Sequence, residues 1–353
     1  MRHHHQVAFA IITLILASAS TRLQAQTLQM VHDGASFAFE AGWSVASAGD
    51  VDGDGTPDVI AGCPDSIVGP GTVQVLSLPT GSLIQAMVGE GMGQQFGAAV
   101  AGGVDVNGDN VPDVLVGAPG YDQGFSFDNR GRGYLFSGSD GTLLHTVTGL
   151  NSYDAYGSAV CFMDDVDGDG TPDFAVGGYG YLGQQGIVHV VSGATGIDIY
   201  TVSGATPGSR FGYAVDSIAD LDGDGHRELL VGAPFDSVNS GAGRVFVLSG
   251  ASGTIISLID GTQPSEHSGT SVCSSGDLDG DGIEEIIIGC PDYDTTDANA
   301  GCARAHSGAN GAALWQVDGP GIYMKAGMDV SSGGDMNMDG IDDILVGMPY
   351  LPP

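Results

Sequence analysis

The chain has 353 residues, of which 43 are acidic and only 9 are basic, giving a formal net charge of −34 at pH 7. This balance argues against binding to nucleic acids, which needs a basic surface, and against binding to anionic membranes. It does not indicate disorder, because 42% of the residues are hydrophobic and the acids lie in short loops between apolar segments.

Residues 1–25 have the pattern of a secretory signal peptide. Arg2 and three histidines precede an apolar run from Val7 to about Ala19, and small-residue cleavage motifs end at Ala19 and at Ala25. The run is too short for a transmembrane helix. We therefore expect an exported protein, secreted or at the cell surface, without insertion into a membrane.

After the leader, a nine-residue acidic loop occurs six times, and each copy runs directly into an apolar segment. Oxygen-bearing side chains occupy loop positions 1, 3, 5 and 9, and such oxygens are the ligands that Ca²⁺ prefers. The sequence therefore predicts up to six Ca²⁺ ions, with the sixth loop the weakest site because Met338 replaces a glycine there. The predicted side-chain ligands are Asp50, Asp52, Asp54 and Asp58; Asp105, Asn107, Asp109 and Asp113; Asp165, Asp167, Asp169 and Asp173; Asp220, Asp222, Asp224 and Glu228; Asp277, Asp279, Asp281 and Glu285; and Asp335, Asn337, Asp339 and Asp343.

The spacing of these loops predicts a repeated unit of four strands. A strand of small residues (96–100 in the second unit, 211–215 in the fourth) precedes the loop, and an apolar strand (113–117 and 228–232) follows it. A glycine-rich loop then leads to a third strand (243–250), and a Ser-Gly-x-x-Gly turn leads to a fourth (254–259). Four short strands with turns between them form an antiparallel sheet, and a series of such sheets in one chain is typical of a β-propeller.

We therefore expect residues 26–353 to be an all-β β-propeller of about six four-stranded antiparallel blades that carry calcium-binding loops, with seven blades as the alternative. The sixth unit lacks a third strand. The segment Leu28–Val31 matches the fourth-strand pattern and is expected to complete that last blade. Either the closing blade is short, or the chain is a shortened version of a larger propeller.

Five cysteines follow the leader, and they form no zinc-binding pattern. Cys63 and Cys290 occupy equivalent Gly-Cys-Pro positions, where other units have alanine, and are expected to be small buried residues. Cys290 and Cys302 flank one loop and are candidates for a disulfide. The cysteines are Cys63, Cys161, Cys273, Cys290 and Cys302.

The units resemble FG-GAP repeats, the blades of the N-terminal propeller of integrin alpha chains. The namesake residues are Phe96-Gly97 with Gly117-Ala118-Pro119, and Phe211-Gly212 with Gly232-Ala233-Pro234, and the other units carry degraded copies. The resemblance implies that calcium is bound on the lower face, in loops that join the first two strands of a blade. It also implies that position-7 backbone carbonyls are ligands, namely those of Thr56, Val111, Thr171, His226, Ile283 and Ile341.

Other interpretations of the calcium loops fit the sequence less well. An EF-hand needs an acid at position 12 and flanking helices, whereas position 12 of the first loop is Ala61, within an apolar β-type segment. A dockerin-like loop also needs a following helix. Integrin-type propellers usually have seven blades, of which only some bind calcium, whereas all six units here have an acidic loop.

No hydrolase, zinc-protease or nucleotide-binding motif is found in an appropriate context, so we expect no enzyme. The best candidate for ligand binding is instead the long loop of residues 119–133, because aromatic and arginine side chains on a rigid scaffold favour recognition. The alternative is that this loop packs back on the propeller, with its arginines paired to acids. Its candidate contact residues are Tyr121, Phe125, Phe127, Arg130 and Arg132.

The leading hypothesis is a secreted, calcium-stabilised β-propeller that acts as an extracellular binding or adhesion module for an unidentified protein or glycan. A second hypothesis is a propeller with hydrolase or lectin-like action on extracellular polysaccharide or glycolipid, since FG-GAP blades also occur in such proteins. A third is a fragment whose ring closes only with a partner or a missing segment.

Overall fold

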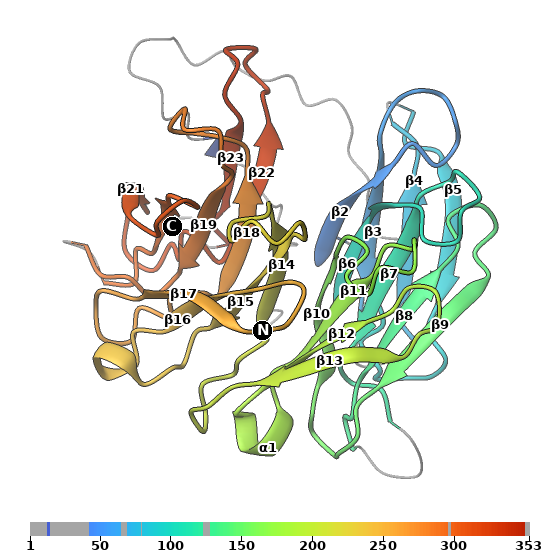
Figure 1. Cartoon of the computed structure of the whole chain (residues 1–353), viewed down its shortest axis with the longest axis horizontal. Helices are drawn as coiled ribbons and strands as arrows, with labels where there is room; N and C mark the ends of the chain where they lie inside the picture. The colour runs from blue at the N-terminus through green and yellow to red at the C-terminus, as the bar shows by residue number, and fades with distance from the viewer. Residues whose placement is uncertain are drawn as a thin grey trace, which may run out of the picture.

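The computed structural model describes residues 13–14, 42–64, 69–78, 80–122, 128–295 and 298–349. The described strands form six antiparallel sheets that follow one another around a common centre (Figure 1). This is the arrangement of a β-propeller of about six blades, and we call the sheets blades 1 to 6. Within the described residues, no helix has both the length and the apolar character needed to span a membrane.

Blades 1 to 5 each have four strands in the order of the sequence. Blade 6 has the order β1-β23-β22, in which the two-residue strand β1 (Thr13–Leu14) pairs with β23. The strands are β2 (Ser44–Gly49), β3 (Asp58–Cys63), β4 (Thr72–Leu76) and β5 (Leu83–Val88) in blade 1; β6 (Ala99–Val104), β7 (Asp113–Ala118), β8 (Arg132–Phe136) and β9 (Leu143–Thr148) in blade 2; β10 (Tyr156–Phe162), β11 (Phe174–Gly178), β12 (Ile187–Val191) and β13 (Asp198–Ser203) in blade 3; β14 (Ala214–Ile218), β15 (Glu228–Ala233), β16 (Arg244–Leu248) and β17 (Ile255–Asp260) in blade 4; β18 (Ser271–Ser275), β19 (Glu285–Cys290), β20 (Cys302–His306) and β21 (Ala313–Asp318) in blade 5; and β22 (Asp329–Gly334) and β23 (Asp343–Gly347) in blade 6.

The first strands of consecutive blades lie beside one another, whereas the fourth strands form the outer edge. The second strands β7, β15 and β19 are buried along their whole length. The fourth strands β5 and β17 instead have several exposed residues. This pattern explains why the second strands are apolar on both faces: each is covered by a neighbouring blade on either side.

The hydrophobic cores lie between blades rather than within them. One core joins Ile60 of blade 1 to Val114 of blade 2, and the next joins Leu115 of blade 2 to Phe174 of blade 3. Three further clusters connect blades 3 with 4, 4 with 5 and 5 with 6 in the same way. A single blade therefore cannot bury its own apolar faces, and stability is shared along the series.

The glycines of the FG and GAP motifs form the closest contacts between blades. Within blade 4, the N–H of Gly212 donates to the carbonyl of Gly232 over 3.1 Å. A Cβ atom on Gly232 would lie 2.1 Å from the carbonyl oxygen of Gly269, which belongs to the next blade. The equivalent glycines of blades 1, 2, 3 and 5 are equally crowded by the following blade, at 1.9–2.3 Å. Only glycine fits at these positions, which ties the motif directly to blade stacking.

The predicted strand boundaries need one correction. Phe96 and Phe211 were expected to begin the first strands of their units, but β6 and β14 begin three residues later. The intervening Gly97 and Gly212 have φ values of +92° and +81°, a conformation that a strand does not use. The two phenylalanines are instead buried at 0% and 1% exposure, as packing residues ahead of the strand.

The described residues also include two short helical turns, α1 (Tyr181–Gln184) and η1 (Val238–Ser240), both in loops between second and third strands. The segment Leu28–Val31, expected to complete the last blade, lies outside the described residues. All five cysteines after the leader are buried free thiols, and Cys290 lies opposite Cys302 in the pairing of β19 with β20.

Candidate functional site

The alternation of strand direction gives the propeller two chemically different faces. Loops between first and second strands and turns between third and fourth strands emerge at one end of the blades, which we call the lower face. Loops between second and third strands, and between one blade and the next, emerge at the opposite end, the upper face. All six acidic loops therefore lie on the lower face.

The first aspartate of each acidic loop organises the loop backbone. In blade 1, the N–H of Gly53 donates to Asp50 Oδ1 over 2.8 Å, and the N–H of Gly55 donates to Asp50 Oδ2 over 2.9 Å. The other loops repeat this pattern, although in the sixth loop the position-4 residue Met338 contributes no such bond. The loop is thus folded around its first carboxylate by side chain-to-backbone hydrogen bonds.

The last acid of each loop is buried and links the loop to the sheet. Asp58 is 1% exposed, and its Oδ2 accepts the N–H of Val51 over 2.9 Å, while its Oδ1 accepts the N–H of Leu78 in the neighbouring turn. Burial raises the pKa of Asp173 to about 6, and also raises the pKa values of Glu228 and Glu285. Backbone N–H groups bonded to these carboxylates favour the charged form and oppose the effect of burial, and a nearby cation would favour the charged form further.

In four loops the acids gather closely enough to share one ion. Their ligand oxygens lie within 4.8 Å of one another. The fifth loop contributes all four of its acids, whereas the other three contribute only positions 1, 3 and 9. Converging carboxylate oxygens on an exposed loop suit a hard cation such as Ca²⁺. The groups are Asp277, Asp279, Asp281 and Glu285; Asp50, Asp52 and Asp58; Asp165, Asp167 and Asp173; and Asp220, Asp222 and Glu228.

The position-5 acid of every acidic loop accepts the N–H of position 7. Asp54 Oδ1 accepts the N–H of Thr56 over 2.8 Å, and the other five loops repeat this contact. The position-5 carboxylate therefore orients the residue whose carbonyl was predicted as a ligand. In the fifth loop Asp281 also joins the acidic cluster, whereas the position-5 acids of loops 1, 3 and 4 do not.

The second and sixth loops differ because asparagine occupies position 3. The amide Nδ2 of Asn337 donates to Asp343 Oδ1 over 3.1 Å, and Asn107 makes the same contact with Asp113 over 3.4 Å. An N–H group thus points at the carboxylate that would face an ion in the other loops. The sixth loop also exposes 91% of Met338, at a φ of +61°. Sequence reasoning singled out the sixth loop and missed the similarity of the second.

Three of the five predicted contact residues of the loop 119–133 are described, and they contact other residues of the protein. Tyr121 is 8% exposed, and the guanidinium of Arg132 lies 3.6 Å from its ring centroid. Arg132 also pairs with Glu90 over 2.8 Å, and Arg130 pairs with Asp128 over 2.6 Å. Phe125 and Phe127 lie outside the described residues. The contacts within the described residues are therefore those expected if this loop packs back on the propeller, with its arginines paired to acids.

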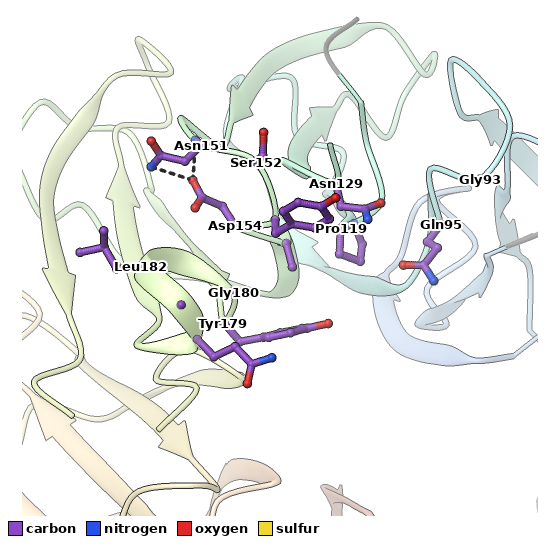
Figure 2. A pocket seen from close by; sticks show the side chains of 14 residues that line it. Gly93, Gln95, Pro119, Asn129, Asn151, Ser152, Asp154, Tyr179, Gly180 and Leu182 are labelled. Carbon is purple, nitrogen blue, oxygen red and sulfur yellow. Dashed lines mark hydrogen bonds between the residues drawn. The ribbon is translucent and has the colours of Figure 1, made fainter. Parts of the chain in front are cut away.

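A hollow of about 900 Å³ opens on the upper face between blades 2 and 3 (Figure 2). Asn151, whose backbone and side-chain N–H groups both contact Asp154, lies on one side, and Tyr179 and Gly180 lie below. Its lining mixes amides, backbone and aromatic rings, and Tyr153 keeps 63% of its surface exposed. Sequence reasoning missed this hollow, because its walls come from loops far apart in the chain.

Comparison with known proteins supports the repeat assignment. A family model described as "FG-GAP repeat" matches residues 41–76, 96–136 and 211–248. Integrin alpha-V of Gallus gallus is 32% identical over 222 residues, covering 58% of this chain and 21% of the relative, and integrin alpha-IIb of Mus musculus is 36% identical over 217 residues, covering 54% and 20%. The chain spans about a fifth of the length of these curated relatives.

Among solved structures, a rhamnogalacturonan lyase superposes with a TM-score of 0.50 at 16% identity, covering 87% of this chain and 55% of that one. At this identity the likeness concerns the fold alone. The three matched repeats correspond to blades 1, 2 and 4 of the structure. The chain thus carries FG-GAP repeats and is a homologue of integrin alpha chains over about half of its length.

Proposed function

We propose that this protein is a secreted, calcium-stabilised β-propeller that serves as an extracellular binding or adhesion module for a protein or glycan partner. The observation that carries this proposal is that the two faces of the propeller differ in their loops. Acidic loops of one design occupy the lower face, whereas the upper face has loops of varied length and a hollow between blades 2 and 3. The similarity to integrin alpha chains supports the same role.

Calcium would be held by the four acidic groups of loops 1, 3, 4 and 5, and more weakly by loops 2 and 6. When bound, the ion supplies positive charge that offsets the repulsion among the loop carboxylates. The chain itself supplies the rest: position 1 folds the loop, and the buried position 9 fixes the loop to the second strand. Secretion from the leader would deliver the protein to a compartment where calcium is abundant.

The upper face suits recognition because its loops stand on a rigid set of sheets. It combines exposed rings with polar groups, as binding surfaces commonly do. Of the predicted contact residues in the loop 119–133, Arg130 retains the most solvent access among those described, with 29% of its side chain exposed. It remains a candidate contact on this face.

The test is a binding survey with the purified protein. The protein is applied to immobilised extracellular-matrix proteins and to a glycan array, with 1 mM Ca²⁺ or with EGTA, as order-of-magnitude extracellular conditions. We expect saturable binding to a partner on one of these surfaces, and loss of that binding in EGTA. Absence of saturable binding from both surfaces would contradict the proposed role.

The catalytic alternative is tested in the same samples. The protein is incubated with pectic and other extracellular polysaccharides, and new reducing ends and unsaturated products are measured over time. We expect no turnover above the level of a heat-inactivated sample. Sustained, enzyme-dependent turnover would replace the binding role with a catalytic one.

A further inference from the structure

The residue before each FG-type dipeptide occupies an equivalent place on the upper face in blades 2 to 6. Gln95, Ala155, Arg210, His267 and Lys325 all have positive φ values, between 51° and 56°. This left-handed conformation is uncommon for residues other than glycine, so the repeat imposes it. Because the backbone is the same at these positions, the blades differ there only in the side chain that they present.

Three of these side chains are basic, namely Arg210, His267 and Lys325. Two of the three, His267 and Lys325, lie beside the same carboxylate. Lys325 Nζ lies 2.9 Å from Asp292 Oδ1, and His267 Nδ1 lies 2.7 Å from Asp292 Oδ2. Arg210 has no carboxylate partner among the described residues. Every other arginine or lysine in the described part of the chain pairs with an acid within 3.0 Å. Such an exception needs an explanation in a chain with a net charge of −34.

Aromatic rings, rather than acids, position the Arg210 guanidinium. Its central carbon lies 4.2 Å from the ring centroid of Phe235 and 5.6 Å from that of Tyr179. The Arg210 N–H donates to the carbonyl of Gln184 over 2.8 Å, which fixes the backbone beneath the side chain. The guanidinium makes no hydrogen bond to the residues that the structure describes, and its Nε is buried without an acceptor. The N–H donors of the guanidinium therefore have no acceptor among the described residues.

The ring over which Arg210 lies is accessible, since Phe235 is 38% exposed. The hollow between blades 2 and 3 has exposed apolar residues of its own, because Leu182 and Tyr153 are more than 60% exposed. Tyr179 both contacts Arg210 and lines the hollow between blades 2 and 3. An oriented cation at the edge of a hollow with exposed apolar groups is complementary to an anion that has an apolar neighbour.

We propose that Arg210 anchors a carboxylate-binding site on the upper face, and that the ligand is an acidic side chain of an extracellular protein, flanked by an apolar residue. This inference rests on the proposed binding function and specifies its partner. A polymer of uronic acids fits less well, because each additional carboxylate would meet the field of a strongly acidic protein, in which the described residues offer one unpaired arginine to receive it. A peptide can place one carboxylate beside apolar groups.

The test uses the full chain, loaded with Ca²⁺, and the arginine Nε–H signals in its NMR spectrum. The probe is an acetylated, amidated tripeptide with aspartate between two phenylalanines, compared with the same tripeptide carrying asparagine and with glucuronate. We expect the aspartate peptide to shift the Arg210 signal saturably. The asparagine peptide should bind about ten- to a hundredfold more weakly, as expected for loss of a charge-assisted hydrogen bond.

Variants separate the site from a general charge effect. Arg210→Gln should weaken binding of the aspartate peptide by a similar factor, and Arg210→Lys should retain part of it, since a lysine keeps the charge but not the planar fork. Arg244→Gln is the matched control, because Arg244 also lies near a ring, that of Phe246, but is paired with Asp260. This control should bind the peptide as the unmodified chain does.

Two results would overturn the inference in different ways. Equal or tighter binding of glucuronate at Arg210 would replace the peptide with a glycan and leave the binding role intact. No shift of the Arg210 signal with any probe, or equal loss of binding in Arg244→Gln, would remove the site itself. The survey of immobilised partners then decides the proposed function separately.

Discussion

At the residue scale, position 9 of each acidic loop joins loop and sheet through one carboxylate. Its oxygens accept the N–H of position 2 in all six loops, and in blades 1 to 4 they also accept an N–H from the turn between third and fourth strands. In blades 1 to 4 such a buried acid is acceptable because backbone donors satisfy both of its oxygens, whereas Oε1 of Glu285 in blade 5 is buried without a hydrogen-bond partner among the described residues. The loop geometry therefore has support from the sheet before any ion is considered.

The asparagine at position 3 lowers the calcium affinity that we expect of the sixth loop. Replacing Asn337 with aspartate removes an N–H donor that faces Asp343 and adds a carboxylate to the group. We expect Asn337→Asp to raise the calcium affinity of this loop by about tenfold, since affinity depends on the number of charged ligands. The measurement is calcium titration calorimetry.

Asn310→Asp serves as the control for Asn337→Asp, because it adds the same charge in an exposed turn of the lower face without a place in any acidic loop. Its calcium isotherm should match that of the unmodified protein. Equal gains in both variants would show that net charge, and not position 3, governs the affinity.

A buried ion pair in blade 5 gives a second prediction at this scale. Arg304 Nη1 lies 2.6 Å from Glu266 Oε1, with the side chains 6% and 0% exposed. Glu266→Gln leaves a buried guanidinium without its counter-charge and should lower the free energy of unfolding by about 3 kcal/mol or more. Glu90→Gln, which breaks the more exposed pair with Arg132, should cost less than about 1 kcal/mol. Urea denaturation of the two variants checks the contrast, which equal losses would contradict.

At the element scale, the FG-GAP motif works as a pair of glycines that let one blade rest on the next. Gly232 supplies a carbonyl to Gly212 in its own blade and leaves no room for a Cβ beside Gly269 of the following blade. The motif is thus a packing requirement rather than a binding signature. The close contact recurs in blades 1 to 5, each of which is followed by another blade, whereas Gly347 of blade 6 meets only Asp329 of its own blade.

Substitution of such a glycine tests this account. Gly232→Ala forces a methyl group against the Gly269 carbonyl at 2.1 Å, and should lower the free energy of unfolding by about 2 kcal/mol. Gly321→Ala is the control, since its Cβ would meet Met324 Sδ at an ordinary 3.4 Å. Chemical denaturation should show little change for the control, and a cost for Gly232→Ala no larger than that of the control would contradict the packing role.

The same elements show how far the sequence predicts this molecule. The second strands and acidic loops were predictable, because Glu228–Gly232 and its preceding loop carry their signal in adjacent residues. The start of the first strands was not, since Phe96 and Phe211 look like strand residues but precede a turn at positive φ. The isolation of Arg210 could not be predicted either, because it depends on which acids the fold places near each base.

At the scale of the whole molecule, neighbouring blades stabilise one another, whereas repulsion among the acids of the lower face opposes folding. The cores lie between blades, so loss of one blade exposes apolar surface on its neighbours. Acids of the lower face are clustered within 4.8 Å in four loops, and each cluster opposes folding until a cation offsets its charge. At tenfold excess over its dissociation constant, each bound ion adds about 1.4 kcal/mol to stability.

The central claim is that calcium in the acidic loops stabilises the propeller. Thermal unfolding of the purified protein, in Ca²⁺ titrated against EGTA and with bound ions counted by calorimetry, tests it most directly. We predict a large upward shift of the melting temperature, with four sites filling first and two weaker ones following. An unchanged melting temperature without calcium binding would contradict the account and leave the six acidic loops without a role.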